Sequence, residues 1–171
     1  MTILICYDGS PDADGAIDRA GQMFTGREAT VLTIWEGFTE VLTRSAAGLA
    51  AAPLNFEEID EANRAGAAER AEQGVARARS AGLDAHPRVV ESGPTLWETV
   101  LGEAEETAAE AIVLGSRGFT GVKSMLLGSV SHAVLQHADR PVMIVPGAQI
   151  AGKRTERRHH HRAADAPAAA R

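Results

Sequence analysis

The sequence predicts a doubly wound α/β domain built on a parallel sheet. Short apolar runs rich in Val and Ile alternate with segments of helical periodicity, and glycine or proline stands at most of the boundaries between them. Aromatic residues make up only 4% of the chain, so the core must consist mainly of aliphatic side chains. Strands that are separated by helices cannot form hairpins. They should therefore lie parallel, with right-handed crossovers and helices on both faces.

The first elements are marked by apolar runs and by residues typical of helix boundaries. Residues 2–7 (TILICY) form a continuous apolar run, which is typical of a strand buried on both faces. Ser10 is a suitable N-cap and Pro11 a suitable first helical residue, so a helix should follow over 11–24. A glycine ends this helix, and the run TVLTIW predicts a second strand over 30–35.

The middle of the chain predicts a loop, a long helix, a strand and a further helix. Residues 36–55 show no regular period and are predicted to be a loop longer than most connections. An Ala-rich helix should run over 56–81 and end at Gly82. A third strand is predicted over 86–90, and apolar residues at helical spacing over 97–108 predict the helix after it.

The last elements complete the domain and precede a tail of different composition. Residues 111–115 (AIVLG) predict a fourth strand, a glycine-containing loop leads to a helix over 129–138, and residues 142–145 predict a fifth strand. We therefore expect a single domain over residues 1–147. Residues 148–171 are basic and Ala-rich without an apolar period, and we expect a disordered C-terminal tail.

Cysteine content, hydropathy and charge restrict the environment and the partners. The single cysteine, Cys6, cannot form an intramolecular disulfide and is predicted to be a buried, inert thiol. No segment approaches the ~18 consecutive apolar residues of a membrane span, and the N-terminus lacks the features of a signal peptide, so we expect a cytoplasmic protein. The net charge of −6 divides into about +4 for residues 147–171 and about −10 for the rest. An acidic body argues against nucleic-acid binding.

The most informative motif is Gly115-Ser116-Arg117-Gly118, followed after nine residues by Gly128-Ser129. It begins where a strand ends and finishes where a helix begins. Ligands of open parallel sheets bind beyond the carboxyl ends of the strands. Glycine allows the backbone to approach a ligand closely, and free amides at a helix start attract anions. The alternative is a surface turn without a ligand. The patterns of the P-loop, the dinucleotide fingerprint and the His-Glu-x-x-His zinc site are all missing.

The motif resembles that of the universal stress protein family, in particular its ATP-binding branch, which is recognised by Gly-x2-Gly-x9-Gly-Ser/Thr. The resemblance also covers ILICYDGS, LTIWE and GSVSHAVLQHADRPVMIVP, and it extends over about residues 1–147. It implies a Rossmann-like nucleotide-binding fold whose five-stranded parallel sheet has the order 3-2-1-4-5.

The resemblance also implies ATP, together with Mg²⁺, as the ligand, and it assigns no catalytic residue and no metal ligand. The nucleotide would lie across the carboxyl ends of the strands, with its phosphates on the glycine loop. The implied contacts are Asp8 near the nucleoside or its metal-linked phosphates, Ile34 at adenine, Gly115 by the ribose, and Gly118, Gly128, Ser129 and Val130 around the phosphates.

Some of these residues have a simpler interpretation. Asp8 precedes Gly9, and the alternative for it is a residue that only forms a turn. Arg117 and Lys123 can lend charge to phosphates or remain solvated, and the bulky Trp35 departs from the family beside the implied adenine pocket.

Three functions follow from these residues. We favour a regulatory ATP-binding protein of the stress response, with at most slow ATP hydrolysis. An alternative is an adenylyl- or phosphoryl-transferring enzyme on a related fold, for which Asp8 is the candidate base, and a third is an interaction module without nucleotide.

His132 and His137 of the last predicted helix are expected to be structural or exposed. The apolar fifth strand, residues 142–145, would occupy a sheet edge and predicts a homodimer.

Overall fold

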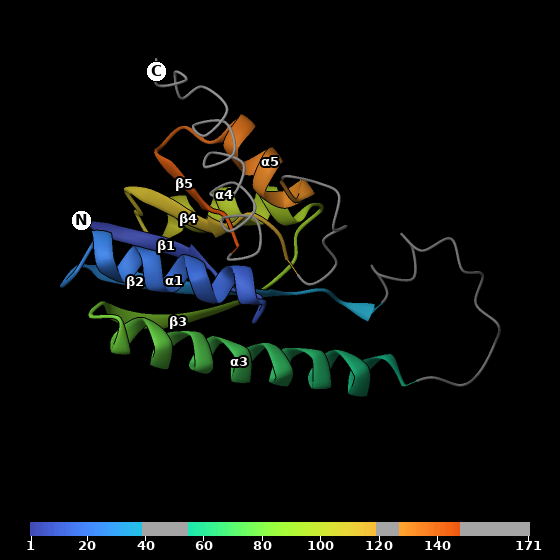
Figure 1. The fold of residues 1–171 in the computed structure, drawn as a ribbon. Helices are drawn as coiled ribbons and strands as arrows, with labels where there is room; N and C mark the ends of the chain where they lie inside the picture. Colours follow the sequence, from blue (N-terminus) through green and yellow to red (C-terminus); the bar gives the residue numbers. More distant parts are fainter. Residues whose placement is uncertain (39–54, 119–126, 148–171) are drawn as a thin grey trace, which may run out of the picture.

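The apolar run at the start of the chain forms the central strand of a five-stranded parallel sheet in the computed structural model (Figure 1). The structure describes residues 1–38, 55–118 and 127–147. The strand order is β3-β2-β1-β4-β5, and each neighbouring pair is parallel. The predicted fold class and strand order are therefore confirmed. In chain order the elements are β1 (Thr2–Cys6), α1 (Pro11–Met23), β2 (Glu28–Trp35), α3 (Phe56–Ser80), β3 (Asp84–Glu91), α4 (Leu96–Glu106), β4 (Ala111–Gly115), α5 (Ser129–His137) and β5 (Val142–Val145).

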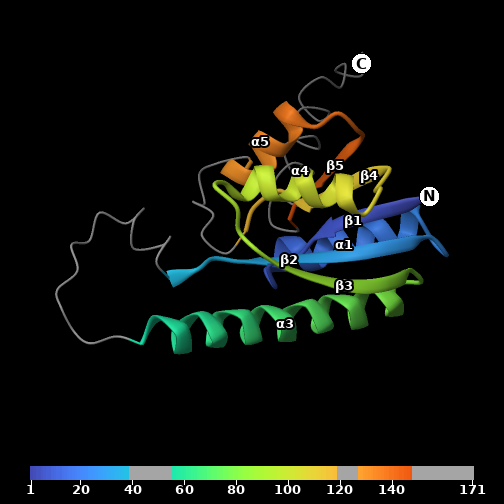
Figure 2. The ribbon, with the colours of Figure 1, turned by 180° about the vertical axis from the view of Figure 1, so that it is seen from behind.

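Helices cover both faces of the sheet, as the views from the two sides show (Figures 1 and 2). On one face α1 and α3 bury Ile3 and Ile5 of the central strand together with alanines of both helices. On the other face α4 and α5 bury Leu4, Leu32 and Ile112. Consecutive residues of β1 thus enter opposite cores, which explains why this strand is a continuous apolar run.

The second and third strands are longer than the sequence predicts. They pair over eight residues each, from Glu28 opposite Asp84 to Trp35 opposite Glu91. The additional residues are mostly polar and lie at the ends of the strands or on β3, which forms one edge of the sheet. An apolar pattern does not detect such positions. Pro87 lies in this edge strand, where a missing backbone N–H is tolerated.

Helix boundaries follow the residues that the sequence singled out. The Ser10 hydroxyl accepts a hydrogen bond from the Ala13 amide at 3.2 Å, and Pro11 is the first helical residue of α1. After α3, Gly82 has a φ of +91°, a conformation that favours glycine. Both helices therefore begin or end for the predicted physical reason.

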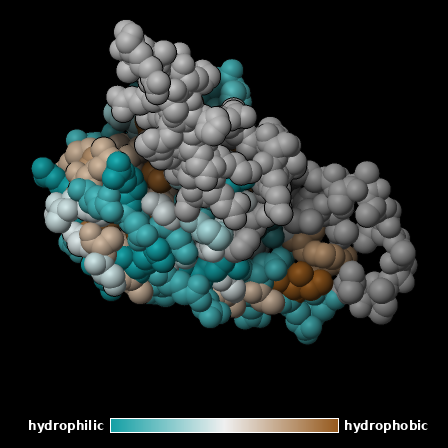
Figure 3. Space-filling view, in the orientation of Figure 1, coloured by the Kyte–Doolittle hydropathy of each residue, from teal (hydrophilic) through white to brown (hydrophobic). Residues whose placement is uncertain are grey.

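The described ranges leave out some of the predicted segments. Most of the predicted loop 36–55, Lys123 and the whole predicted tail 148–171 lie outside the described residues. No helix in the described ranges combines the length and the apolar character that a membrane span requires. The described part of the surface in Figure 3 is mostly hydrophilic over α1 and α3.

Candidate functional site

A pocket of about 720 Å³ opens at the carboxyl ends of β1, β2 and β4. The chain leaves β1 for α1 on one face of the sheet, whereas the loop after β4 leads to α5 on the other face. This divergence is the place where open parallel sheets bind ligands, and the volume is in the usual range of ligand pockets. All seven residues implied to contact nucleotide line this pocket: Asp8, Ile34, Gly115, Gly118, Gly128, Ser129 and Val130.

Asp8 combines a role in the turn with a position in the pocket. Its Oδ1 accepts a hydrogen bond from the Ser10 amide at 2.9 Å, which forms the Asx turn leading into α1. Its Oδ2 lies beside Gly118, where a Cβ would come within 2.5 Å of that oxygen. Both interpretations of Asp8 thus agree with the geometry, because the turn fixes the carboxylate at the wall of the pocket.

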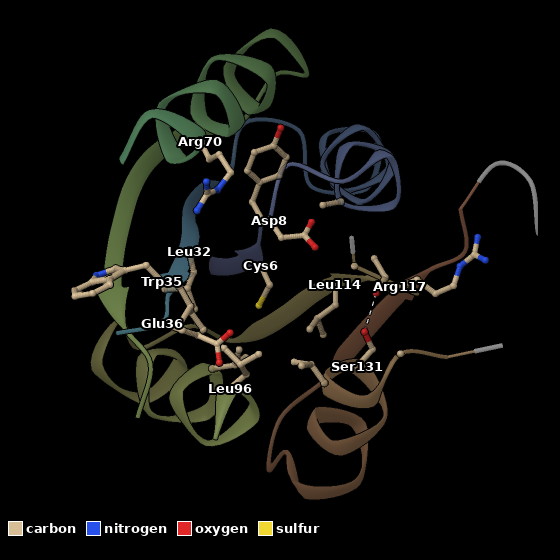
Figure 4. Close-up of a pocket in the computed structure, with 18 of the residues that line it drawn as sticks. Cys6, Asp8, Leu32, Trp35, Glu36, Arg70, Leu96, Leu114, Arg117 and Ser131 are labelled. Atoms are coloured by element: carbon tan, nitrogen blue, oxygen red, sulfur yellow. Dashed lines mark hydrogen bonds between the residues drawn. The ribbon is translucent and has the colours of Figure 1, made fainter. Parts of the chain in front are cut away.

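The first glycine of the motif is required by packing. A Cβ at Gly115 would lie 2.7 Å from the carbonyl carbon of Asp12, in the first turn of α1. The Gly115 carbonyl accepts a hydrogen bond from the Ser131 hydroxyl at 2.8 Å, which joins the end of β4 to α5 (Figure 4). Gly115 therefore holds two helices close to the end of β4.

The second half of the motif presents backbone amides. Gly128 is the N-cap residue of α5, and its own N–H donates to the Ser116 carbonyl at 2.7 Å. The helix begins without a side-chain cap, and its first backbone hydrogen bond runs from the His132 N–H to the Gly128 carbonyl. The amides of the first turn, at Ser129 and Val130, are therefore available to an anionic ligand, and the helix dipole favours negative charge there.

Arg117 lines the pocket, but its side chain is turned away from it (Figure 4). Its Nε lies 3.4 Å from Asp12 Oδ2, and both side chains are largely buried. The same carboxylate oxygen accepts from the Ser116 hydroxyl at 2.9 Å. A Cβ at Gly147 would collide with Asp12, so the chain after β5 also packs on this carboxylate. Arg117 is thus part of a clamp between the loop, α1 and the end of β5, and not a solvated charge.

The opposite part of the pocket is apolar. Its floor and walls include Cys6, Leu32 and Leu114. The indole of Trp35 is directed away from the middle of the pocket, so this bulky residue leaves room at the implied adenine position (Figure 4). Such a surface suits the flat face of a nucleobase.

Cys6 was predicted to be a buried, inert thiol; in the structure it is half-buried and lines the pocket, so the burial is only partial. Its inertness has a physical basis nonetheless. Burial, and secondly the negative charge of Asp8, raise the pKa of the thiol to about 12. The thiolate, which is the reactive form, is therefore scarce at neutral pH.

The sequence does not predict one wall of the pocket. Residues of α3 line it, and Glu36 follows β2 beside them. The Asn63 side chain lies 3.5 Å from the Glu36 carbonyl and connects this wall to β2. The spacing of these α3 residues in the sequence predicts one face of a helix but does not indicate that this face lines a pocket. They reach the pocket because α3 packs over the ends of the strands. The stripe consists of Ala62, Asn63, Gly66 and Arg70.

The two histidines of α5 lie at the surface. His132 and His137 are exposed, as expected, and His137 stacks on Trp97 with ring centroids 4.5 Å apart. Within the described ranges no three His, Cys, Asp or Glu side chains gather as metal ligands would. A cation that accompanies a nucleotide would therefore need phosphate oxygens and water among its ligands, as Mg²⁺ commonly has.

Comparisons with known proteins find a family that matches most of the chain. The model of the universal stress protein family matches residues 1–146. The chain is 32% identical over 145 residues to universal stress protein YxiE of Bacillus subtilis, which covers 84% of this chain and 97% of that protein.

Two solved structures share the fold. A universal stress protein in complex with cAMP has a TM-score of 0.60 and 24% identity, covering 86% of this chain and 98% of the other. A family member from Arabidopsis thaliana with AMP bound has a TM-score of 0.59 and 16% identity, covering 85% and 91%.

Proposed function

The chain belongs to the universal stress protein family, and from this premise we propose that it is a regulatory protein that binds an adenine nucleotide, ATP in particular. The observation that carries the proposal is the convergence on one pocket of an apolar floor, the Asp8 carboxylate and the first-turn amides of α5. The complexes of related proteins with cAMP and AMP support the adenine class of ligand.

Each part of the pocket has a role in this proposal. Adenine lies against the apolar surface at Ile34, and the ribose lies between Asp8 and Gly115. The phosphates receive hydrogen bonds from the backbone around Gly118 and from the start of α5. The contacts at the helix start come from Gly128, Ser129 and Val130.

The affinity must come from several contacts together. A micromolar dissociation constant corresponds to about 8 kcal/mol. One hydrogen bond or one helix-dipole contact contributes only ~1 kcal/mol. The glycine loop alone therefore does not account for such binding, and burial of the base against the apolar floor must supply much of the rest.

Mg²⁺ would accompany a triphosphate, with Asp8 as the carboxylate near enough to contribute. Asp8 already accepts the Ser10 amide and lies against Gly118. We therefore assign it to positioning and not to rapid proton transfer. Any hydrolysis of ATP by this chain should be slow, since it would rest on positioning and charge alone.

We further propose a cytoplasmic, homodimeric protein. The single cysteine suits a reducing compartment. β5 lies at the edge of the sheet, where its free backbone groups can pair with the same strand of a second copy. We also propose that residues 1–147 form the domain and that residues 148–171 are a C-terminal tail outside it.

The function is tested by the nucleotide that co-purifies with the protein. The protein is purified without added nucleotide and denatured by heat, and the released small molecules are identified by mass spectrometry. We expect ATP or another simple adenine nucleotide, in a ratio approaching one per chain. An acyl- or aminoacyl-adenylate would instead indicate the transferase, and a guanine or pyrimidine nucleotide would contradict the proposal.

A further inference from the structure

Arg70 reaches the pocket from a wall that the glycine motif does not include. It lies on α3, one helical turn after Gly66, and its side chain is half-buried. Figure 4 shows its guanidinium directed into the pocket, on the side away from Arg117 and Ser131. A Cβ at Gly66 would lie 3.5 Å from Arg70 Nη1, so the guanidinium rests beside the small residue of the preceding turn.

The guanidinium of Arg70 makes no hydrogen bond or ion pair within the described residues. Other arginines there are paired: Arg77 with Asp18 at 2.6 Å, Arg88 with Glu103 at 2.6 Å and Arg117 with Asp12 at 3.4 Å. A partly desolvated cation without a protein partner favours an anionic ligand, and the planar guanidinium suits phosphate in particular. Arg70 is therefore poised to bind an anion in the pocket.

The position of Asp8 indicates which part of a nucleotide this anion would belong to. In Figure 4 the Asp8 carboxylate lies between Arg70 and the loop that carries Arg117. In dinucleotide-binding folds a carboxylate holds the free ribose hydroxyls of one cofactor, whereas an arginine in the same region accommodates the ribose phosphate of the other. The 5′-phosphates occupy the glycine loop, on the other side of Asp8. An anion at Arg70 would thus be attached to the ribose.

We propose that Arg70 binds a phosphate on the 2′- or 3′-oxygen of the ribose, so that the pocket prefers adenine nucleotides phosphorylated at both the 5′ position and the ribose ring. This inference rests on the proposed function, because it takes the orientation of the nucleotide from it. The glycine loop supplies one anion site, and Arg70 of α3 supplies the second.

Calorimetric titration tests the inference with three ligands: AMP, adenosine 3′,5′-bisphosphate and adenosine 2′,5′-bisphosphate. We expect the wild-type protein to bind one of the two bisphosphates roughly tenfold or more tightly than AMP, which is the effect of one charge-assisted contact. In Arg70→Gln this preference for a bisphosphate over AMP should disappear. Arg70→Lys should keep part of the preference for the bisphosphate. The isomer that binds more tightly to the wild-type protein shows whether Arg70 contacts a phosphate on the 2′- or on the 3′-oxygen of the ribose.

Arg64→Gln is the matched control, because Arg64 is an exposed arginine on the same helix and does not line the pocket. It should keep the full preference for the bisphosphate. If AMP binds but neither bisphosphate binds more tightly, or if the preference survives Arg70→Gln, the inference is wrong and the proposed function stands. If none of the three ligands nor ATP binds, both are overturned.

Discussion

At the scale of single residues, the three glycines of the motif have different physical reasons. A side chain at Gly115 would collide with the backbone of α1, and one at Gly118 would collide with the Asp8 carboxylate. At Gly128 a Cβ would be 3.4 Å from the Ser116 carbonyl oxygen, which is an ordinary contact. The first glycine is therefore required by the fold, the second by the close approach of Asp8, and the third is not required by packing.

Gly115→Ala should destabilise the domain. The new methyl group would press on the backbone of Asp12, which cannot rotate away, and overpacking of this kind costs about 1–3 kcal/mol. Thermal unfolding followed by circular dichroism should show a melting temperature lower by several degrees. Gly102→Ala is the control, because that glycine is helical with nothing within 4 Å of its Cβ position. It should stabilise the domain slightly, and equal melting temperatures for the two variants would contradict the packing argument.

Cys6 should react slowly with thiol reagents, with an unusual pH dependence. Its pKa is raised from 9.0 to about 12, so the thiolate fraction at pH 8 is about a thousandfold lower than for an unshifted thiol. The rate of reaction with Ellman's reagent should rise about tenfold per pH unit between pH 8 and 10.5 without levelling. Unfolding in urea should remove the effect. Since the chain has a single cysteine, the reaction reports on Cys6 alone. A reaction rate that stops rising near pH 9 in the folded protein would contradict the raised pKa of Cys6.

At the scale of elements, Asp12 joins three segments that are distant in the sequence. It binds Ser116 and Arg117 after β4, and Gly147 after β5 packs against it. Asp12 is in the first turn of α1, where a negative charge is also favoured by the helix dipole. The clamp thus fixes the start of the glycine loop relative to α1.

Asp12→Asn should weaken this clamp without changing its shape. The amide can still accept from Ser116, but the charge that holds Arg117 is lost, and we expect the domain to lose about 1–2 kcal/mol of stability. Hydrogen exchange of the amides over 115–118 should accelerate more than that of β1. Asp18→Asn removes an exposed ion pair from the same helix and should leave this loop unchanged. Equal exchange in both variants would exclude the clamp.

The sequence predicts the elements better than their functional contacts. Apolar runs and cap residues locate every described strand and helix, because local physics determines them. The ends of β2 and β3 are missed, since polar residues such as Glu28 and Asp84 join a ladder through backbone hydrogen bonds alone. The wall formed by α3 is missed for a related reason: Arg70 carries no local signal, and only tertiary packing brings it to the pocket.

At the scale of the whole molecule, the sheet has one charged and one apolar edge. The edge strand β3 carries Pro87, His86 and Arg88, which discourage pairing with another sheet. The edge strand β5 is VMIV without a charge or a proline. We therefore expect the proposed dimer to form through β5.

Ile144→Pro should convert the proposed dimer into a folded monomer. The carbonyls of Pro141 and Val145 accept hydrogen bonds from the Ile112 and Ser116 amides on the β4 side, so strand alternation turns the N–H of Ile144 to the free edge. Proline removes that donor at a position where an edge strand tolerates it. Met143 and Val145 are less suitable for substitution, because they pack against the core beneath α1. Light scattering at micromolar concentration decides the point: a monomeric wild type, or a dimer unchanged by the substitution, would contradict it.

We propose that the glycine loop holds the phosphates of an adenine nucleotide. Titration of ATP into the wild-type protein and into Gly128→Val decides whether it does. A Cβ at Gly128 meets no atom closer than 3.4 Å, so the fold should remain intact, and we expect a β-branched side chain at this N-cap position to hinder the approach of phosphate to the first-turn amides of α5. We predict micromolar, one-to-one binding to the wild type and none detectable to the variant, with the same circular dichroism spectrum for both. Wild-type affinity in the folded variant would show that the loop does not hold the phosphates.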